Sequence, residues 1–383
     1  MAEQKVRKRK AKRYMDFGLL LNVVVLLAFG LVMLFSTSTY EAALELGDEY
    51  YYFTHQLVAI LLGLVAYFII TFFPYKIYEK FAFIIYIVAC GVLFLVKTPL
   101  AYSANGAVRW IRIAGVSIQP AEICKSLMIV FLASFISKLG KNVATRKGFL
   151  TTLGVALLPA FLVYTLTDNL SSAVIILGIA LTMLFVSCPD YKRFIIIGVC
   201  VAGVALSAVA YAKNAESSAN LNFRFNRILA WLHPEAYTSS YGMQTLQALY
   251  AIGSGGLFGK GLGESLQKLG TLPEAQNDMI FSIVCEELGL FGALAVIILF
   301  VMLIYRIRII ADDAPDMYSA LLTVGVMSHI AIQVILNIAV VTNTIPNTGI
   351  TLPFFSYGGS AILMQLCEIG IVSSVSYRIP VRD

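Results

Sequence analysis

Charged residues, histidine and closely spaced cysteines are scarce in this sequence. Only 13% of its 383 residues are charged, whereas about a quarter are charged in a soluble globular protein. The six cysteines show no CxxC spacing, and the three histidines lie far apart. The sequence therefore predicts neither a disulfide framework nor a zinc site. We interpret the cysteines as small buried hydrophobic residues and the histidines as packed or interfacial ones.

Long apolar runs fill most of the chain instead. Hydrophobic residues make up 59% of it, and several runs approach the roughly 20 residues that a helix needs to cross a membrane. The runs are too continuous for the alternating strands of a membrane β-barrel. We predict an all-α polytopic membrane protein with ten transmembrane helices, at Phe17–Ser36, Phe53–Phe73, Phe81–Val96, Ala121–Ser137, Phe149–Thr165, Leu170–Ser187, Phe194–Tyr211, Ile280–Ile304, Tyr318–Val340 and Gly359–Val375.

Basic residues predict the orientation of these helices. Lys and Arg crowd the tail at residues 1–16, and the loops on the same side carry most of the other cations, which marks that side as cytoplasmic. The membrane domain then covers residues 17–376, and the tail at 377–383 is also cytoplasmic. The large segment at 212–278, between the seventh and eighth helices, is extracytoplasmic. We expect the basic tail to contact membrane lipids and no nucleic acid, because no folded basic domain follows it.

Four carboxylates gather in the stretch LPEAQNDMIFSIVCEELG, where the large segment meets the eighth predicted helix. An ionised group at membrane depth costs roughly 3 kcal/mol, so such residues usually face a cavity and mark a function. Glu274 and Asp278 are four residues apart and are expected to share a helix face. Asp278 is the candidate catalytic residue, and a helix N-cap is the alternative. One of Glu286 and Glu287 is expected to neutralise a cation on another helix.

Cations occur in two of the predicted outer segments and in one helix. Arg109 belongs to the second outer segment, and Arg224 and Arg227 belong to an amphipathic helix in the large one. They are predicted either to anchor the chain at headgroup level or to bind a diphosphate, which suits the guanidinium fork. Glu122 and Lys125 form a predicted ion pair that either supports the fold or brings a cation to the site.

Glycine and proline interrupt two further outer stretches. The run GSGGLFGKGLG at Gly253–Gly263 lacks the GxxxxGK[ST] pattern of a phosphate-binding loop, so it is interpreted as backbone that packs closely against other elements. The stretch Pro346–Gly359 is interpreted as a re-entrant loop that lines a pocket, because irregular backbone at membrane depth must be buried in protein or face a cavity. Ser356 would offer a hydroxyl there.

Four of these stretches together resemble the SEDS family (shape, elongation, division and sporulation). They are GAVRWI at 106–111, QPAE at 119–122, LPEAQNDMIF with EELG at 272–289, and PNTGITLPFFSYGGS at 346–360. The last two look closer to the FtsW and SpoVE branches than to RodA. The chain departs from many relatives at Gln276 and Asn277, which leaves Asp278 in place. It also departs from them at 167–170, so no role is carried over to Asp168.

The resemblance implies a peptidoglycan glycosyltransferase in the bacterial cytoplasmic membrane. Such enzymes polymerise lipid II at the outer face, with a class B penicillin-binding protein and other division proteins as partners. The family's essential aspartate falls on Asp278, and its other motif residues fall on Arg109, Glu122 and Lys125. Arg224, Arg227, Glu274 and Ser356 are added as substrate-binding candidates. A divalent cation such as Mg²⁺ could share the electrostatic role at the diphosphate, and neither metal ligands nor another cofactor are assigned.

Two other functions stay open on the sequence alone. A lipid II flippase would also need many spans and intramembrane charges, but it would be expected to place polar groups near the midplane and in both halves. A division scaffold without activity of its own would not need the carboxylates and arginines. The crowding of the unusual motifs on one side favours chemistry at the membrane surface.

Overall fold

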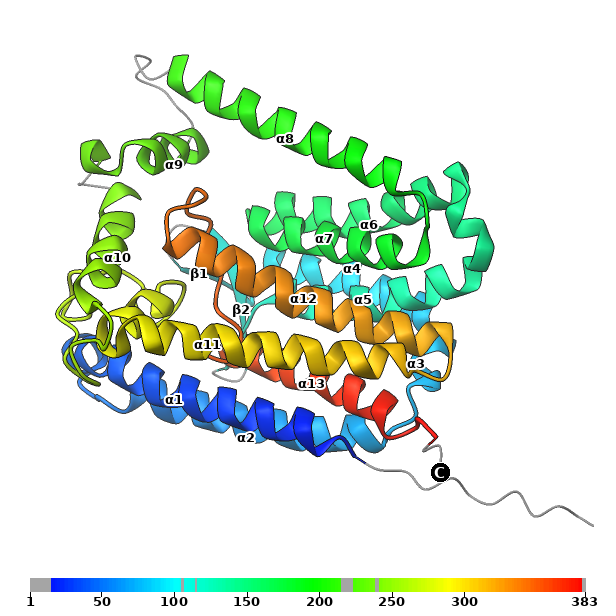
Figure 1. Ribbon diagram of the computed structural model, residues 1–383, viewed down its shortest axis with the longest axis horizontal. Coiled ribbons are helices and arrows are strands. Elements are labelled where there is room, and N and C mark those ends of the chain that lie inside the picture. The colour runs from blue at the N-terminus through cyan, green and yellow to red at the C-terminus, as the bar shows by residue number, and fades with distance from the viewer. Residues whose placement is uncertain (1–14, 105–106, 114–115, 215–222, 238–240, 381–383) are drawn as a thin grey trace, which may run out of the picture.

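Helices arranged side by side form most of the molecule (Figure 1). The structure, a computed structural model, describes residues 15–104, 107–113, 116–214, 223–237 and 241–380. The basic tail before residue 15 and the last three residues lie outside this description. The helices begin with α1 (Phe17–Leu46), α2 (Tyr51–Phe72), α3 (Lys76–Lys80), α4 (Ala82–Leu93), η1 (Phe94–Lys97), α5 (Pro120–Leu139), η2 (Gly140–Ala144), α6 (Arg146–Thr167), α7 (Leu170–Ser187) and α8 (Tyr191–Asn214). They continue with α9 (Phe223–Leu232), η3 (Pro234–Tyr237), α10 (Tyr241–Gly255), α11 (Ile280–Asp312), α12 (Met317–Val341) and α13 (Gly359–Ser376).

Each of the ten predicted spans corresponds to helix in the structure. Among the described residues, nine helices are long and apolar enough to cross a membrane, and the tenth, Ala82–Lys97, is a shorter apolar helix. α6 continues through Pro159 and ends at Asp168, whose φ of 49° is left-handed. The prediction of a helical, multi-pass membrane protein is confirmed.

Three short strands among the described residues depart from the predicted all-α fold. β1 (Ala101–Ala104), β2 (Ala107–Ile113) and β3 (Val116–Ile118) form an antiparallel sheet in the order β1-β2-β3. β2 carries Arg109 and Trp110, so residues 107–111 of the GAVRWI stretch lie in a strand. The sheet lies near one end of the helices (Figure 1).

α12 occupies a central place in the bundle. It packs against α5, α7, α11 and α13, and most of its residues are buried. Asp316 begins it with a capping box, in which the carboxylate accepts from the backbone N–H of Ser319 at 2.8 Å. In contrast, α8 lies along one edge of the bundle, and Ala212 is its single buried residue (Figure 1).

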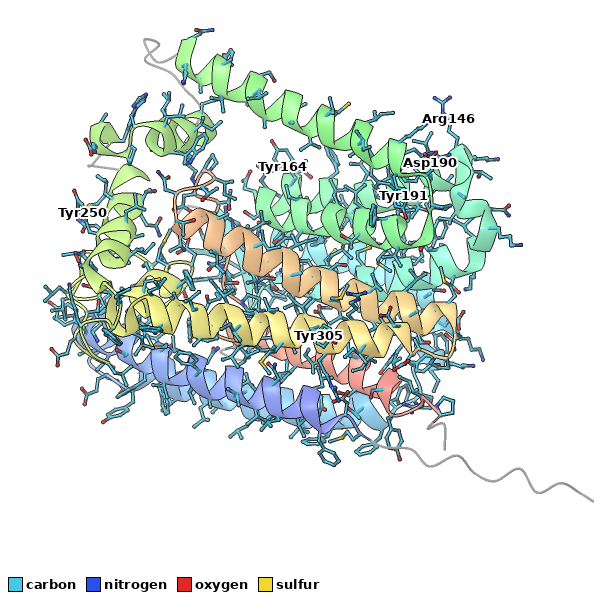
Figure 2. All side chains as sticks on the ribbon, viewed as in Figure 1. Arg146, Tyr164, Asp190, Tyr191, Tyr250 and Tyr305 are labelled. Atoms are coloured by element: carbon cyan, nitrogen blue, oxygen red, sulfur yellow. The ribbon has the colours of Figure 1, made fainter. Side chains whose placement is uncertain are left out.

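Different residues mark the two ends of the bundle. Arg146, Asp190 and Tyr191 lie together at one end, and Tyr250 of α10 lies at the other (Figure 2). The first end also holds Asp16 and Arg306, which form an ion pair at 3.0 Å. The start of α11 and the stretch after α12 lie at the Tyr250 end (Figure 1), and the candidate site is built from them.

Candidate active site

Asp278 stands directly before α11, in a stretch of turns. The turns run from Gly270 to Met279, and Glu274 within them has a left-handed φ of 58°. The prediction that Glu274 and Asp278 share a helix face is therefore wrong. The alternative of a helix cap is also wrong, because the N-cap of α11 is Met279 and no side chain caps the helix. Asp278 is left with a position at the helix entrance and no capping role.

The carboxylate of Asp278 is buried among polar groups. The residue is 8% exposed, and its Oδ1 accepts from Nε2 of Gln244 at 3.3 Å. Burial raises the pKa of Asp278 to about 7, the charge of Glu274 adds to this rise, and the charge of Arg227 opposes it. A buried carboxyl group with a pKa near neutrality and charged groups around it is a candidate for proton transfer.

Arg227, whose charge acts on Asp278, belongs to α9, and α9 is hydrogen-bonded to the residues after α12. Nε1 of Trp231 donates to the carbonyl of Asn343 at 2.9 Å, and Nδ2 of Asn343 donates back to the carbonyl of Trp231 at 3.4 Å. Arg227 lies one turn before Trp231. The predicted helix is thus confirmed, and the charge of one of its two arginines, Arg227, acts on Asp278. The side chain of Arg224 lies outside the described residues.

The stretch Pro346–Gly358, here called the 346–358 loop, is bonded to the Asp278 segment. The hydroxyl of Ser356 donates to the carbonyl of Asn277 at 2.5 Å and accepts from the N–H of Leu352 at 2.7 Å. The N–H of Tyr357 donates to the carbonyl of Gln276 at 2.9 Å. The irregular loop is therefore folded against protein, and its lining of a pocket stays a prediction. Ser356 is buried and uses its hydroxyl within the chain, so it holds the two segments together.

Arg109 lies at the same end of the bundle and is linked to the same loop. Its guanidinium donates to the carbonyls of Thr167 at 3.3 Å and Asp168 at 3.1 Å, between α6 and α7. Three residues on, the hydroxyl of Ser171 donates to the carbonyl of Thr348 at 2.6 Å. In the same loop, Gly349 lies close to the carboxylate of Asp278, because a Cβ added to Gly349 would be 3.6 Å from Oδ2 of Asp278. The prediction that these outer stretches meet at one end is confirmed.

Glu122 and Lys125 form the predicted ion pair inside the bundle. Their charged atoms are 2.9 Å apart, and both residues are buried. Nζ of Lys125 also donates to Oε1 of Gln333 on α12 at 3.4 Å. Of the two alternatives for this pair, the geometry favours support of the fold, because both side chains are buried inside the bundle.

Glu286 and Glu287 neutralise cations, but not on another helix as predicted. Nζ of Lys260 lies 2.6 Å from Glu286, and Nζ of Lys268 lies 2.7 Å from Glu287. Both lysines belong to the connection between α10 and α11. Ser36 of α1 also donates to Glu287 at 2.7 Å. Both carboxylates are fully buried, so the pairs fasten this connection, which ends at Asp278, onto the first turns of α11.

The glycine run docks onto a break in α11, as its interpretation as closely packed backbone predicts. At Gly289 the φ of 66° is not helical, and the helix loses backbone bonds there. Its neighbours replace them: the N–H of Leu290 donates to the carbonyl of Gly256 at 3.0 Å, and the N–H of Lys260 donates to the carbonyl of Glu286 at 2.9 Å. The run therefore completes the hydrogen bonding of α11 at the break.

Comparison with known proteins identifies the family of this chain. Residues 17–379 match the FtsW/RodA/SpoVE family, described as "Cell cycle protein". The chain belongs to this family. It is 37% identical to stage V sporulation protein E of Bacillus subtilis (strain 168) over 367 residues, which cover 94% of this chain and 96% of that protein.

A second relative and a solved structure also match nearly the full length of the chain. The chain is 35% identical to the probable peptidoglycan glycosyltransferase FtsW of Coxiella burnetii (strain RSA 493 / Nine Mile phase I), over 95% of this chain and 96% of that one. Its fold is similar to a chain of a peptidoglycan synthase complex that coordinates polymerization and crosslinking. That likeness has a TM-score of 0.77 at 23% identity and covers 96% and 99% of the two chains. The predicted SEDS membership is thus confirmed.

Several polar residues around the site were missed by sequence reasoning. Asn337 and Gln333 of α12 and Gln244 of α10 bond the Asp278 segment or the 346–358 loop. Deeper in the bundle, Nδ1 of His329 lies 2.8 Å from Glu368, which also accepts from Ser126. An amide or an acid inside a long apolar run is the signal that could have found them. His329 was interpreted as a packed residue, which is correct, but its acidic partner was overlooked.

Metal binding at the site stays a prediction. In the described ranges, no group of three or more His, Cys, Asp or Glu side chains is placed to hold a metal ion. A resident Mg²⁺ would need several oxygen ligands at short distance.

If the chain polymerises lipid II, as proposed below, Arg227→Gln is expected to slow that reaction and to change its pH dependence. Removing the cation that opposes the burial effect raises the pKa of Asp278, so the acid side of the pH–rate profile moves to higher pH. The rate should fall at least about tenfold, because one preorganised charge is lost. The measurement is the polymerisation rate across pH, with Arg112→Gln as the matched control. Arg112 is exposed and its guanidinium lies over the ring of Tyr102, so a loss of the same size there would contradict a specific role for Arg227.

Proposed function

We propose that this member of the FtsW/RodA/SpoVE family is a peptidoglycan glycosyltransferase that polymerises lipid II for septal cell-wall synthesis. Two relatives that span nearly its full length carry the names stage V sporulation protein E and probable peptidoglycan glycosyltransferase FtsW. The observation that carries the proposal is the buried carboxylate of Asp278, whose pKa of about 7 suits a general base, beside the charge of Arg227.

Asp278 acts as the general base in the proposed reaction. The 4-hydroxyl of an acceptor N-acetylglucosamine attacks C1 of a donor N-acetylmuramic acid, and the bond from C1 to the undecaprenyl diphosphate breaks. Asp278 takes the hydroxyl proton, and the diphosphate departs with the electron pair of the broken bond. A positioned base of this kind contributes about 10² to 10⁴ in rate. A single displacement inverts the α-linked donor to a β-linked product.

The departing diphosphate requires positive charge at the same end of the bundle. Arg227 is the first candidate, because its charge acts on Asp278. Arg109 is the second, since its guanidinium is oriented by the α6–α7 turn. Arg224 remains a candidate as the neighbour of Arg227 on α9. Lys125 is assigned a supporting role, because it is buried against Glu122. Glu274 would contact the sugars from the rim of the site, whereas Ser356 would act by holding the backbone.

A divalent cation such as Mg²⁺ is proposed to arrive with the diphosphate, because the part of the chain that the structure describes holds no group of three His, Cys, Asp or Glu side chains that could bind an ion. Removing it with a chelator would then slow the reaction, and added Mg²⁺ would restore the rate. No other cofactor enters the proposal.

The proposed location is the bacterial cytoplasmic membrane, with both termini in the cytoplasm and the Asp278 end outside. Arg306, Arg193 and Lys76 lie at the opposite end and support this orientation through the preference of basic residues for the cytoplasmic side. Lipid II is reached in the outer leaflet. The partners are a class B penicillin-binding protein and other division proteins, which the likeness to a chain of a peptidoglycan synthase complex supports. Membrane lipids surround the helices.

A lipid II flippase is the second candidate function. The pair of His329 and Glu368 favours it, because the two residues lie near the middle of α12 and α13 and are almost fully buried. Ionisable groups at that depth often belong to transport pathways. A scaffold without catalysis is the third candidate, and it leaves the Asp278 site unexplained.

Reconstitution distinguishes these functions. The purified chain and its cognate penicillin-binding protein are placed in vesicles with lipid II, and two quantities are measured: glycan strands, and the movement of lipid II between leaflets. The proposed function predicts strands. Translocation of lipid II without glycan strands would establish the flippase. If neither activity is observed, the scaffold function remains.

A further inference from the structure

Two buried amides on one face of α12 connect the elements of the site. Gln333 and Asn337 are one helical turn apart, and both are at most 1% exposed. Nε2 of Gln333 donates to the carbonyl and to the hydroxyl of Thr351, at 3.1 Å each. One turn further along α12, the side chain of Asn337 is hydrogen-bonded to Ile350, the residue before Thr351.

The amide of Asn337 joins two segments that are far apart in the sequence. Its Nδ2 donates to the carbonyl of Asp278 at 2.8 Å and to the carbonyl of Ile350 at 2.7 Å. An amide nitrogen carries two hydrogens, so both are used. The orientation of the amide follows from these partners, because its oxygen could not face two carbonyl oxygens.

We propose that Asn337 is a positioning residue, which fixes Asp278 relative to the 346–358 loop. This inference rests on the proposed function for its catalytic meaning, although the contacts themselves do not depend on it. α12 is a central helix packed on several sides, so it supplies a rigid base for the two carbonyls. Other bonds set the rest of the geometry: Gln244 bonds the carboxylate of Asp278, and Nδ2 of Asn347 donates to Oε1 of Gln244 at 2.7 Å.

Loss of the Asn337 bonds should loosen the carboxylate without removing it. Two buried carbonyls would lack donors, and the Asp278 segment would separate from the loop. Water could then reach the carboxylate, so the burial effect on its pKa would weaken. Glu274 and Arg227, the charged groups that act on Asp278, stay in the chain: Glu274 lies in the same stretch of turns, and Arg227 lies on α9.

The test compares Asn337→Leu with Asn22→Leu in the full-length protein. Asn22 is also a buried asparagine in a spanning helix, and its Nδ2 donates to one carbonyl, that of Leu299, at 3.4 Å, away from the site. The first readout is the titration of Asp278, which is monitored by infrared difference spectroscopy. The carboxyl band of Asp278 is identified as the band that is missing from the Asp278→Asn variant. The second is lipid II polymerisation per folded protein.

Asn337→Leu is expected to lower the titration midpoint of Asp278 by about one pH unit or more. It should lower kcat about 10- to 100-fold, with KM changed less than about threefold, because a misplaced group costs rate more than binding. Asn22→Leu should change neither readout. Asn337→Ser keeps one donor and should show a smaller change in the same direction, so it decides the question if the leucine variant does not fold.

Equal midpoints and equal rates in the Asn337 and Asn22 variants would overturn the inference. The parent protein could form no glycan strands while Asn337→Leu still shifts the titration midpoint of Asp278. Asn337 would then remain the residue that positions Asp278, and the missing strands would refute the proposed function instead. The two failures are thus distinguishable.

Discussion

Asp278→Asn is expected to abolish the formation of glycan strands from lipid II while the protein becomes more stable. An asparagine has the size of the aspartate but cannot take a proton from the acceptor hydroxyl, so the rate should fall by about 10² to 10⁴. The stability change has the opposite sign because the buried carboxylate is costly to ionise.

The sign of this stability change follows from the raised pKa. Burial lifts the pKa of Asp278 from 3.8 to about 7 in the folded protein, so the folded state binds a proton more tightly than the unfolded state between these values. Stability is therefore lost as pH rises from about 4 to about 7. Above that range, Asp278→Asn should stabilise the fold by up to about 4 kcal/mol, since each pKa unit corresponds to about 1.4 kcal/mol.

The measurements are strand formation and thermal unfolding at about pH 8. Asp313→Asn is the matched control, because Asp313 is an exposed acid at the other end of α11 and should change neither quantity. An active Asp278→Asn variant would remove Asp278 from the mechanism. A variant that is inactive and also less stable than the parent would show that the carboxylate supports the fold.

Gly259→Ala is expected to prevent the connection between α10 and α11 from folding. A Cβ at Gly259 would lie 2.1 Å from the backbone carbonyl oxygen of Glu287, and the φ of +79° is unfavourable for alanine. Neither backbone can move easily, because the bonds that bridge the break in α11 hold both. The loss of stability should reach several kcal/mol, as in other overpacked sites with backbone strain.

Gly263→Ala separates close packing from backbone strain. Gly263 also has a positive φ, of +89°, but a Cβ there would have no atom within 4 Å. It should cost only about 1 kcal/mol, which is the strain of the conformation. Folded yield and thermal unfolding of the two variants are compared. Equal losses would mean that docking onto the α11 break contributes nothing beyond local strain.

The positions of the spanning helices could be predicted because membrane burial leaves a strong and local signal. Each apolar run became a helix, and α6 continued through Pro159 because a proline in a spanning helix can be accommodated by its surroundings. The clustering of Asp278, Arg109 and the 346–358 loop at one end could also be predicted, since counting spans fixes which segments share a side.

The contacts within the site could not be predicted, because they depend on residues far apart in the sequence. Glu274 and Asp278 have helical spacing, but the left-handed backbone at Glu274 places them in turns. The partners of Glu286 and Glu287 were sought on another helix, and Lys260 and Lys268 lie instead in the preceding connection. Asn337 carries no charge and sits in an apolar run, so its pattern alone gave no reason to connect it with Asp278.

The pH–rate profile of lipid II polymerisation tests most directly whether Asp278 is the base. The parent protein should lose rate about tenfold per pH unit below about pH 7, as the carboxylate becomes protonated, and should reach a plateau above it. A rate that stays constant from about pH 5 to about pH 8 would contradict a base with this pKa, and with it the proposed mechanism.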